Sequence, residues 1–283
     1  MGKLLVVAPQ AGFGNRMRAL CSGIVLARYL QREVRHLWLP EENATQLSPF
    51  PHVAAIQNTS FESLFQATPL LPRANLTQKA TSCYGEWGIG SYWHQYQGSG
   101  WRHIGGEGCV FNPIATDATA LLTDDSDIIL LETSHVVLLP ACAEQWSAAM
   151  TAVYQELFVS RLEYTARLPT QTPRVGVSLR RGEFLIYFPE ARQEEAALRA
   201  WWLALVATEG SDQAMLFSDD YRLRDELRHA SNSSCDIIRG EANGFVEFLA
   251  LSRCAQVYGT PSSSFAVQAA LFGGGRYNAI AIS

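Results

Sequence analysis

The chain lacks the features that mark a membrane, nucleic-acid or metal-binding protein. No apolar run reaches the roughly 18 residues that a membrane-spanning helix needs. Charged residues make up only 17% of the 283 positions and the formal net charge is −5, so no basic surface for nucleic acid is expected. The six cysteines form no CxxC pair and show no zinc-ligand spacing. The sequence therefore predicts no metal, no nucleic acid and no membrane span.

The first apolar stretch starts at Leu4, so the sequence as it stands is not expected to include a leader segment. As the chain stands, this predicts a cytoplasmic protein. The N-x-S/T sequons at Asn43, Asn58, Asn75 and Asn232 favour the lumen of the ER or Golgi instead, if a signal or anchor was removed. The sequence leaves both compartments open.

Apolar residues are plentiful, at 48% of the chain, and suffice for one large core or two smaller ones. Apolar segments typical of strands alternate with helix-like segments, which predicts an α/β architecture with mostly parallel sheets. The turn-rich segment 169–173 predicts a boundary between domains 1–168 and 169–283. The expected strands are 3–8, 34–39, 127–132, 174–179, 213–218, 234–238, 255–259 and 277–282, and the expected helices are 15–31, 60–66, 142–157, 191–208, 221–230, 243–253 and 263–272.

A glycine turn follows the first predicted strand. Gly12-Phe13-Gly14-Asn15-Arg16 joins that strand to a helix-like stretch. This order places free backbone N–H groups at a helix N-terminus, where an anionic group is stabilised. The third glycine of a dinucleotide fingerprint is replaced by Met17, so the turn predicts a phosphate-containing ligand other than NAD.

Polar residues follow three strands of the second predicted domain. Arg180 and Arg181 come directly after the strand 174–179, at the edge where α/β sheets bind ligands, and their guanidinium groups suit phosphate. Alternatively, Arg180 and Arg181 form ion pairs at the protein surface and bind no ligand. Asp219 and Asp220 follow the next strand as acceptors for a base or ribose, or else Ser218 or Asp219 caps the helix that starts near Tyr221.

Three consecutive hydroxyl groups, Ser262, Ser263 and Ser264, join strand 255–259 to a helix. At a helix N-terminus they combine side-chain donors with backbone N–H groups, which predicts a second phosphate site.

Aromatic residues and glycines dominate residues 83–108. This composition excludes a regular helix. It predicts either a long ordered loop or a platform for a sugar acceptor, with Trp87, Tyr92, Trp93 and Trp101 as candidate contacts. Cys83 and Cys109 flank the segment and are either bridged or unpaired.

Together these segments resemble the GDP-fucose-dependent fucosyltransferases, which include the protein O-fucosyltransferases, the alpha-1,6-fucosyltransferases and the NodZ-type enzymes. The segment GFGNRMRAL (12–20) is similar to the family's GxGNRxRAL start. Its three C-terminal motifs resemble VGVSLRRGE (175–183), FSDD (217–220) and FLALSRCAQVYGTPSSSF (248–265). The resemblance implies the GT-B fold, in which two Rossmann-like domains face each other across a cleft.

The resemblance also implies a reaction, namely metal-independent, inverting transfer of fucose from GDP-fucose to a hydroxyl of a glycan or glycoprotein. Arg180 would bind the β-phosphate with support from Arg181, and Ser263, Ser264 and the Phe265 backbone would complete the cradle. Asp219 and Glu247 would read the guanine or ribose, and Asp220 lies beside them. Asn15 and the Gly12–Gly14 turn, with Phe13 and Arg16, would lie across the cleft near the sugar. No cofactor is expected besides the donor.

Two positions leave the mechanism open. The family histidine two places before Arg180 is Ser178 here, which leaves open another nucleotide sugar, such as a different GDP-sugar, or a non-catalytic binding protein. Asn15, Arg180 and the three serines speak against the non-catalytic alternative. His94, His103 and His135 are not expected to replace it. Glu183 lies near enough to act as the base for the acceptor, or it pairs with Arg181.

A rival interpretation rests on Asp125-Ser126-Asp127, which matches the DxD of metal-dependent transferases.

Overall fold

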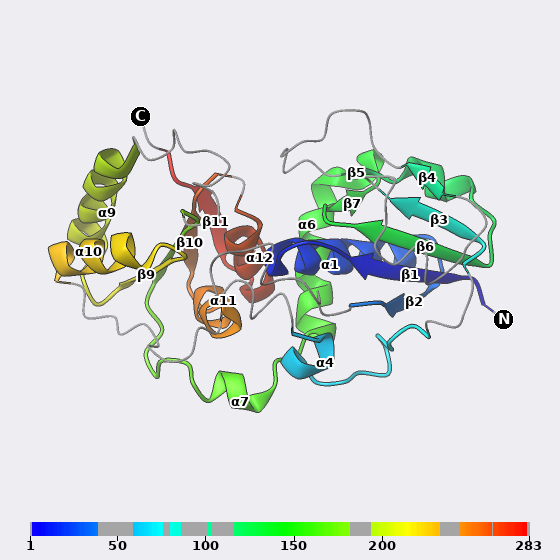
Figure 1. Cartoon of the computed structure of the whole chain (residues 1–283), viewed down its shortest axis with the longest axis horizontal. Coiled ribbons are helices and arrows are strands. Elements are labelled where there is room, and N and C mark those ends of the chain that lie inside the picture. Colours follow the sequence, from blue (N-terminus) through cyan, green and yellow to red (C-terminus); the bar gives the residue numbers. More distant parts are fainter. Residues whose placement is uncertain are drawn as a thin grey trace. The chain divides into compact units, whose positions relative to one another are not determined.

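The computed structural model describes residues 2–38, 59–75, 80–85, 101–103, 116–181, 194–232, 244–261 and 263–281 (Figure 1). The chain divides into two compact units, the first drawn from Met1–Pro40 and Ser60–Val159. The second takes in Ser160–Ser283. The chain thus passes from one unit to the other before the turn-rich segment 169–173 at which the sequence predicts a boundary.

The first unit is built on a parallel sheet of five strands in the order β2-β1-β6-β3-β4. Its strands are β1 (Leu4–Pro9), β2 (Glu33–His36), β3 (Ser82–Gly85), β4 (Trp101–His103) and β6 (Ile128–Thr133). Every residue of β1 is buried, because Leu4 and Val6 belong to an apolar cluster that also holds Cys83 and Leu130, while Val7 lies against Gly23 of the first helix. A strand covered on both faces is expected to be apolar throughout, as this one is.

Helix α1 (Phe13–Tyr29) packs on this sheet, and α6 (Ala143–Leu157) packs on α1. The remaining short elements are α4 (Phe61–Leu64), β5 (Thr116–Asp117), β7 (Val137–Leu138) and the 3-10 helices η1 (Thr119–Thr123) and η2 (Pro140–Cys142). Strands β5 and β7 pair with each other outside the main sheet.

The second unit holds a four-stranded parallel sheet in the order β11-β10-β8-β9. Its strands are β8 (Val175–Leu179), β9 (Ala214–Ser218), β10 (Gln256–Gly259) and β11 (Arg276–Ala279), and its helices are α7 (Leu162–Thr165), α9 (Glu195–Glu209), α10 (Tyr221–Ser231), α11 (Gly244–Ser252) and α12 (Ser264–Gly273). In Figure 1, α9 and α10 cover one face of this sheet and α11 and α12 cover the other.

Residues of β8 alternate between these two layers. Val175 and Val177 belong to the apolar cluster formed with Trp202 of α9 and Leu227 of α10. Gly176 points the other way, and a Cβ there would lie only 2.7 Å from Leu251 of α11. A doubly covered strand of this kind is typical of parallel α/β sheets, so the α/β architecture predicted from the sequence is confirmed.

The segment 83–108 differs from its expected form. Part of it contributes strands β3 and β4 to the parallel sheet of the first unit, rather than a loop throughout. Cys83 is a buried free thiol within β3, so the bridge to Cys109 is absent. The thiol packs in the apolar cluster with Leu130.

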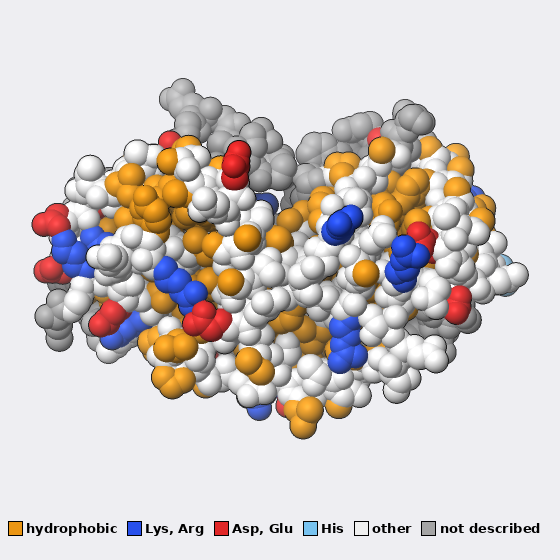
Figure 2. All heavy atoms as spheres, turned by 180° about the vertical axis from the view of Figure 1, so that it is seen from behind, with side chains coloured by type: hydrophobic (Ala, Val, Ile, Leu, Met, Phe, Trp, Pro, Cys, Tyr) orange, Lys and Arg blue, Asp and Glu red, His pale blue; other side chains and the backbone are white. Residues whose placement is uncertain are grey.

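The surface of the molecule carries mixed charge. Figure 2 shows positive and negative side chains scattered among apolar and uncharged ones, with no broad area of one sign among the described residues on that face. Within the described ranges, no helix combines the length and the apolar character needed to span a bilayer.

Candidate functional site

Side chains with phosphate-binding chemistry gather at the carboxyl edge of the β8-β9-β10 part of the sheet. Arg180 follows β8, Asp219 follows β9 and Thr260 follows β10. These strands are parallel neighbours, with β8 lying between β9 and β10, so their carboxyl ends meet at one edge. Ligands of open α/β sheets bind at this edge, which makes it the candidate site.

Arg180 is fixed in place through its backbone. Its N–H donates to Oγ1 of Thr260 over 3.0 Å, and the Thr260 N–H donates to the Ser178 carbonyl over 3.2 Å. These two hydrogen bonds therefore join the carboxyl end of β8 to the turn after β10. The Arg180 side chain is half-buried. Because its backbone is fixed, the side chain extends from a defined point at the carboxyl edge of the sheet.

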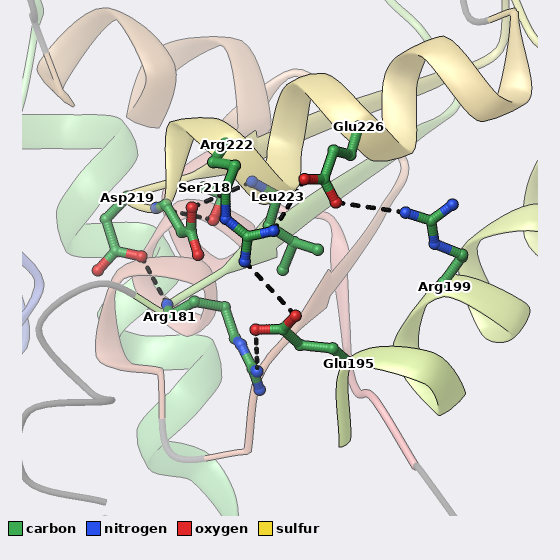
Figure 3. Close-up of polar contacts among 9 residues, drawn as sticks. Arg181, Glu195, Arg199, Ser218, Asp219, Arg222, Leu223 and Glu226 are labelled. Carbon is green, nitrogen blue, oxygen red and sulfur yellow. Dashed lines mark hydrogen bonds and ion pairs between the residues drawn. The ribbon is translucent and has the colours of Figure 1, made fainter. Parts of the chain in front are cut away.

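Arg181 has a different environment from its neighbour, since its side chain is only 3% exposed. Its N–H donates to Oδ1 of Asp219 over 2.5 Å, while its guanidinium extends to Glu195 of α9, 3.4 Å away. Figure 3 shows these two contacts on opposite ends of the residue. Glu195 also pairs with Arg222 of α10 at 3.5 Å. Arg181 therefore ties β8 to α9 and orders the Asp219 carboxylate.

The carboxylates after β9 separate into two roles. Asp220 caps α10, because its side chain accepts from the Leu223 N–H over 3.0 Å. Ser218 accepts from the Asp220 N–H over 3.1 Å, and Asp219 accepts from Arg181. The cap is thus Asp220, so the prediction that Ser218 or Asp219 caps this helix is wrong. The chain stays extended at Asp220, which places the cap at the residue directly before Tyr221.

Glu247 of α11 lies in the electrostatic environment of Asp219, Tyr221 and Arg224. Burial raises the pKa of the Glu247 carboxyl to about 7, and the negative Asp219 adds to the rise while Arg224 opposes it. The Arg224 guanidinium stacks on the Tyr221 ring, 4.5 Å from its centroid. Burial is the main cause that raises the pKa of the Tyr221 phenol, and the negative charges of Glu247 and Asp219 raise it further. This group places a carboxyl that changes charge near neutral pH beside an aromatic ring and a cation.

Helix α12 brings its N-terminus to this edge. Ser263 caps it by accepting from the Ala266 N–H over 3.5 Å, and both Ser263 and Ser264 are buried. The approach is close, because a Cβ on Gly259 would lie 2.6 Å from Cβ of Ala266. Phe265, half-buried, packs edge-on against Phe248 of α11. The positive end of the helix dipole and the Ser263 and Ser264 hydroxyls therefore come within four residues of Thr260.

The glycine turn of the first unit forms as expected, with Gly12 as the extended N-cap residue of α1. Arg16 is fully buried below the turn, where its Nε donates to the Ala11 carbonyl over 2.8 Å and its guanidinium lies 5.6 Å from the Trp38 ring centroid. Phe13 and Gly14 are buried and Asn15 is half-buried. Arg16 thus supports the backbone turn, and Asn15 stays the accessible polar side chain of the motif.

Several predicted site residues lie outside the described residues, namely Glu183, Ser262, Trp87, Tyr92 and Trp93, as do the sequons at Asn43 and Asn58. Trp101 belongs to β4, but its side chain is not described. The contacts expected of these residues stay predictions.

The Asp125–Asp127 segment carries other interactions. Asp125 forms an ion pair with Lys3, and the segment enters β6 at its amino end, away from the carboxyl edge of the sheet. Burial raises the pKa of the Asp124 carboxyl, but hydrogen bonds from Ser126, Tyr84 and Ser82 outweigh it and lower the pKa below its usual value. Over the described ranges, no three His, Cys, Asp or Glu residues gather in a way that would hold a metal ion.

Comparison with solved structures identifies the fold. POFUT1 in complex with GDP-fucose aligns with 100% of this chain and 98% of its own, at 14% identity and a TM-score of 0.61. NodZ alpha-1,6-fucosyltransferase soaked with GDP-fucose aligns over 96% and 93%, at 15% identity and a TM-score of 0.58. NodZ from Bradyrhizobium aligns over 96% and 94%, at 15% identity and a TM-score of 0.58. The chain has the fold of these fucosyltransferases.

The GT-B fold expected from the resemblance is therefore confirmed. No family model matches the sequence, and no protein with a curated description matches it. The identities are low enough that the fold is shared without close sequence similarity, which leaves the roles of individual residues to be argued from this chain.

Three residues of the GT-B fold's second unit were missed from the sequence. Thr260 fixes the Arg180 backbone, Glu195 holds Arg181, and Arg224 stacks on Tyr221. Thr260 carried a signal, since a hydroxyl directly after a strand lies at the ligand edge. Arg224 lies three residues after Tyr221, the spacing of neighbours on one helix face. Glu195 carried none, because its partner Arg181 lies 14 residues earlier, beyond the spacing of any local pattern.

Proposed function

We propose that this chain is a glycosyltransferase that transfers fucose from GDP-fucose to a hydroxyl of a glycan or glycoprotein. The observation that carries the proposal is the arrangement at the carboxyl edge of β8, β9 and β10, within a chain that aligns end to end with POFUT1 in complex with GDP-fucose. The resemblance of the four sequence motifs supports the same donor.

Arg180, Ser263 and Ser264 are the proposed donor-phosphate residues. Arg180 supplies a fork of N–H donors that matches phosphate oxygens, and Thr260 holds its backbone 3.0 Å away. Ser263 and Ser264 begin α12, whose N-terminus favours negative charge. Arg181 takes a positioning role instead, since its guanidinium is buried against Glu195. Asp219 and Glu247 are the proposed acceptors for the donor guanine, whose N1–H and 2-amino group are adjacent donors.

The proposed reaction is a single displacement at the anomeric carbon. The acceptor oxygen forms a bond to that carbon from one side as the bond to the β-phosphate oxygen breaks on the other. The electron pair of the broken bond leaves with GDP, and the acceptor hydroxyl passes its proton to a base, for which Glu183 is the proposed residue, or to water. Negative charge grows on the departing diphosphate, where Arg180 and the start of α12 stabilise it. Fixed donors aimed at developing charge usually provide the largest catalytic term. The proposal requires no metal.

Ser178 is the position at which this chain departs from the family motif, and the departure bears on which nucleotide sugar is the donor. The side chain is buried in β8, in register with Gly259, and its carbonyl holds Thr260. The backbone contribution of this position is thus present without the histidine ring. Another nucleotide sugar would show as a different donor in the same assay, and a non-catalytic relative would bind donor without turnover.

The experiment is a donor-turnover assay with GDP-fucose, GDP-mannose and UDP-glucose, with and without EDTA, in the presence of glycan and glycopeptide acceptors. The proposal expects GDP release and fucosylated product from GDP-fucose alone, unaffected by EDTA, with inverted anomeric configuration by NMR. Arg180→Ala should lose the activity. Arg161→Ala, an exposed arginine paired with Glu163 on α7, is the matched control and should retain it. Turnover of another sugar, or a strict metal requirement, contradicts the proposal.

A further inference from the structure

A second basic site lies at the opposite, amino-terminal edge of the same sheet. A groove of about 450 Å³ is lined by Arg174, Arg253 and Arg276 together with the glycine turn 273–275. Arg174 directly precedes β8, Arg276 begins β11, and Arg253 lies between α11 and β10. The strand register aligns Gln256 with both Val175 and Arg276, so the entries of these three strands lie side by side.

The arginines of this groove exceed the negative charge around it. Arg174 pairs with Glu209 at the end of α9, 3.4 Å away. Arg253 donates to the neutral carbonyl of Pro169 over 3.4 Å. Arg276 is exposed and forms no ion pair within the part of the chain that the structure describes. Among the described residues, one carboxylate and the negative ends of α11 and α12, about half a charge each, face three guanidiniums. The groove keeps a positive excess of about one charge, which attracts an anion.

The backbone of the glycine turn is fully occupied and supplies no further donors. The N–H groups of Gly274, Gly275 and Arg276 donate to Leu271, Ala270 and Ala255 carbonyls, at 3.3, 2.9 and 3.0 Å. A Cβ on Gly273 would lie 1.6 Å from the Ser252 carbonyl oxygen, so glycine is required by packing there. The turn therefore shapes the wall of the groove, and any anion must be bound by the arginine side chains.

A purely structural role accounts for part of this arrangement. Helices α11 and α12 end next to the groove, at Ser252 and Gly273, and cations near helix C-termini are favourable. One arginine near the C-terminus of each helix is enough for this stabilisation, and its side chain can lie anywhere on the nearby surface. This structural role does not account for the concavity of about 450 Å³ that Arg253 and Arg276 line together with Arg174.

We propose that this groove binds a small oxyanion carrying two negative charges, a phosphate or sulfate group that is either free or attached to a sugar. Two arginine forks, from Arg253 and Arg276, match the tetrahedral oxygens of such a group. Arg174 contributes less, because Glu209 already neutralises it in part. The site is separate from the proposed donor site, since it lies at the other ends of the strands.

The test is calorimetric titration with inorganic phosphate, inorganic sulfate and glucose 6-phosphate on the Arg180→Ala background, which removes the proposed donor-phosphate arginine. We expect binding that Arg276→Gln and Arg253→Gln each weaken by about tenfold or more, as loss of a charged hydrogen bond does. Arg199→Gln, an exposed arginine paired with Glu226, is the matched control and should bind as the background does. Tighter binding of glucose 6-phosphate than of phosphate identifies a sugar-borne group, and equal binding identifies the free ion.

Two results overturn the proposal. One is binding that neither Arg276→Gln nor Arg253→Gln changes, which places the anion elsewhere. The other is the absence of binding by all three probes, which leaves the arginines with the structural role alone. Thermal unfolding of each variant establishes that it is folded. Because donor binding is not measured, failure here leaves the proposed transferase function untouched.

Discussion

Glu247 should make the stability of this protein depend on pH in a distinctive direction. Burial, with help from Asp219, raises the pKa of its carboxyl from 4.5 to about 7. The unfolded chain ionises Glu247 above its ordinary pKa, whereas the folded chain keeps it neutral up to about pH 7. Stability from this group is therefore full below pH 4.5, declines as the pH rises toward 7, and is constant above that.

The magnitude follows from the shift. Each pKa unit corresponds to about 1.4 kcal/mol, so the change from 4.5 to about 7 amounts to roughly 3 kcal/mol. Glu247→Gln removes the titration and keeps the shape of the side chain. The variant should therefore be more stable than the parent at high pH. The difference between their free energies of unfolding should grow by up to roughly 3 kcal/mol as the pH rises from 4.5 to 8.

Urea unfolding of both proteins across this pH range measures the difference, and Glu247→Asp, which keeps an ionisable carboxyl, should behave like the parent. A difference between parent and Glu247→Gln that stays constant with pH refutes the reasoning. If the ionised carboxylate also accepts from guanine, GDP affinity in the parent should fall as the pH drops below 7, and Glu247→Gln should lack that part of the dependence.

The remaining predictions concern the elements that hold the candidate site. Arg181→Gln should destabilise the fold by about 1–2 kcal/mol in urea unfolding, less than the loss of a fully buried pair, because Glu195 is partly exposed and keeps Arg222. It should weaken GDP binding far less than Arg180→Ala, and an equal loss would contradict its positioning role. Gly259→Ala should cost about 1–3 kcal/mol and reduce GDP affinity, because its Cβ would lie 2.6 Å from Ala266; unchanged stability and affinity would show that α12 tolerates displacement. Trp202→Phe should cost about 2–4 kcal/mol by thermal or urea unfolding, because this fully buried ring loses volume and the Nε1–H that donates to the Leu227 carbonyl over 3.1 Å; no loss would mean that the core closes around the smaller ring.

Local sequence patterns predicted most of the regular elements. The expected strands 3–8, 174–179 and 213–218 form as Leu4–Pro9, Val175–Leu179 and Ala214–Ser218. Each is a continuous apolar run, and burial on both faces makes such runs easy to recognise. The expected helix 263–272 forms as Ser264–Gly273, since a serine cap and a following glycine mark its ends. The expected strand 234–238 lies outside the described residues.

Elements without a local pattern were missed. Strand β3 holds serine and glycine, and β4 has only three residues. They are strands because β6 offers β3 a parallel partner and β3 in turn offers one to β4. Strands β5 and β7 have only two residues each, too few for any periodicity. Tertiary pairing decides such segments, and it is not visible in a single sequence.

The candidate site shows the same division. The residue types that follow the strands were identifiable, because the carboxyl edge of a parallel sheet is a known ligand position. The different roles of Arg180 and Arg181 were not, since they depend on Glu195 and Thr260, which are distant in the chain. The choice of Asp220 as cap depends on the backbone angles where β9 ends.

The central claim is that the edge formed by Arg180, Thr260, Ser263 and Ser264 binds a guanosine diphosphate sugar. Calorimetric titration with GDP, GDP-fucose, GDP-mannose and UDP-glucose, with and without EDTA, on the parent and on Arg180→Ala tests it most directly. The account predicts tight binding of GDP and GDP-fucose that EDTA does not affect and that Arg180→Ala weakens by about 1.5–3 kcal/mol, the loss typical of a hydrogen bond to a charged group. Binding without preference for guanine, binding only in the presence of metal, or unchanged affinity in Arg180→Ala would contradict it.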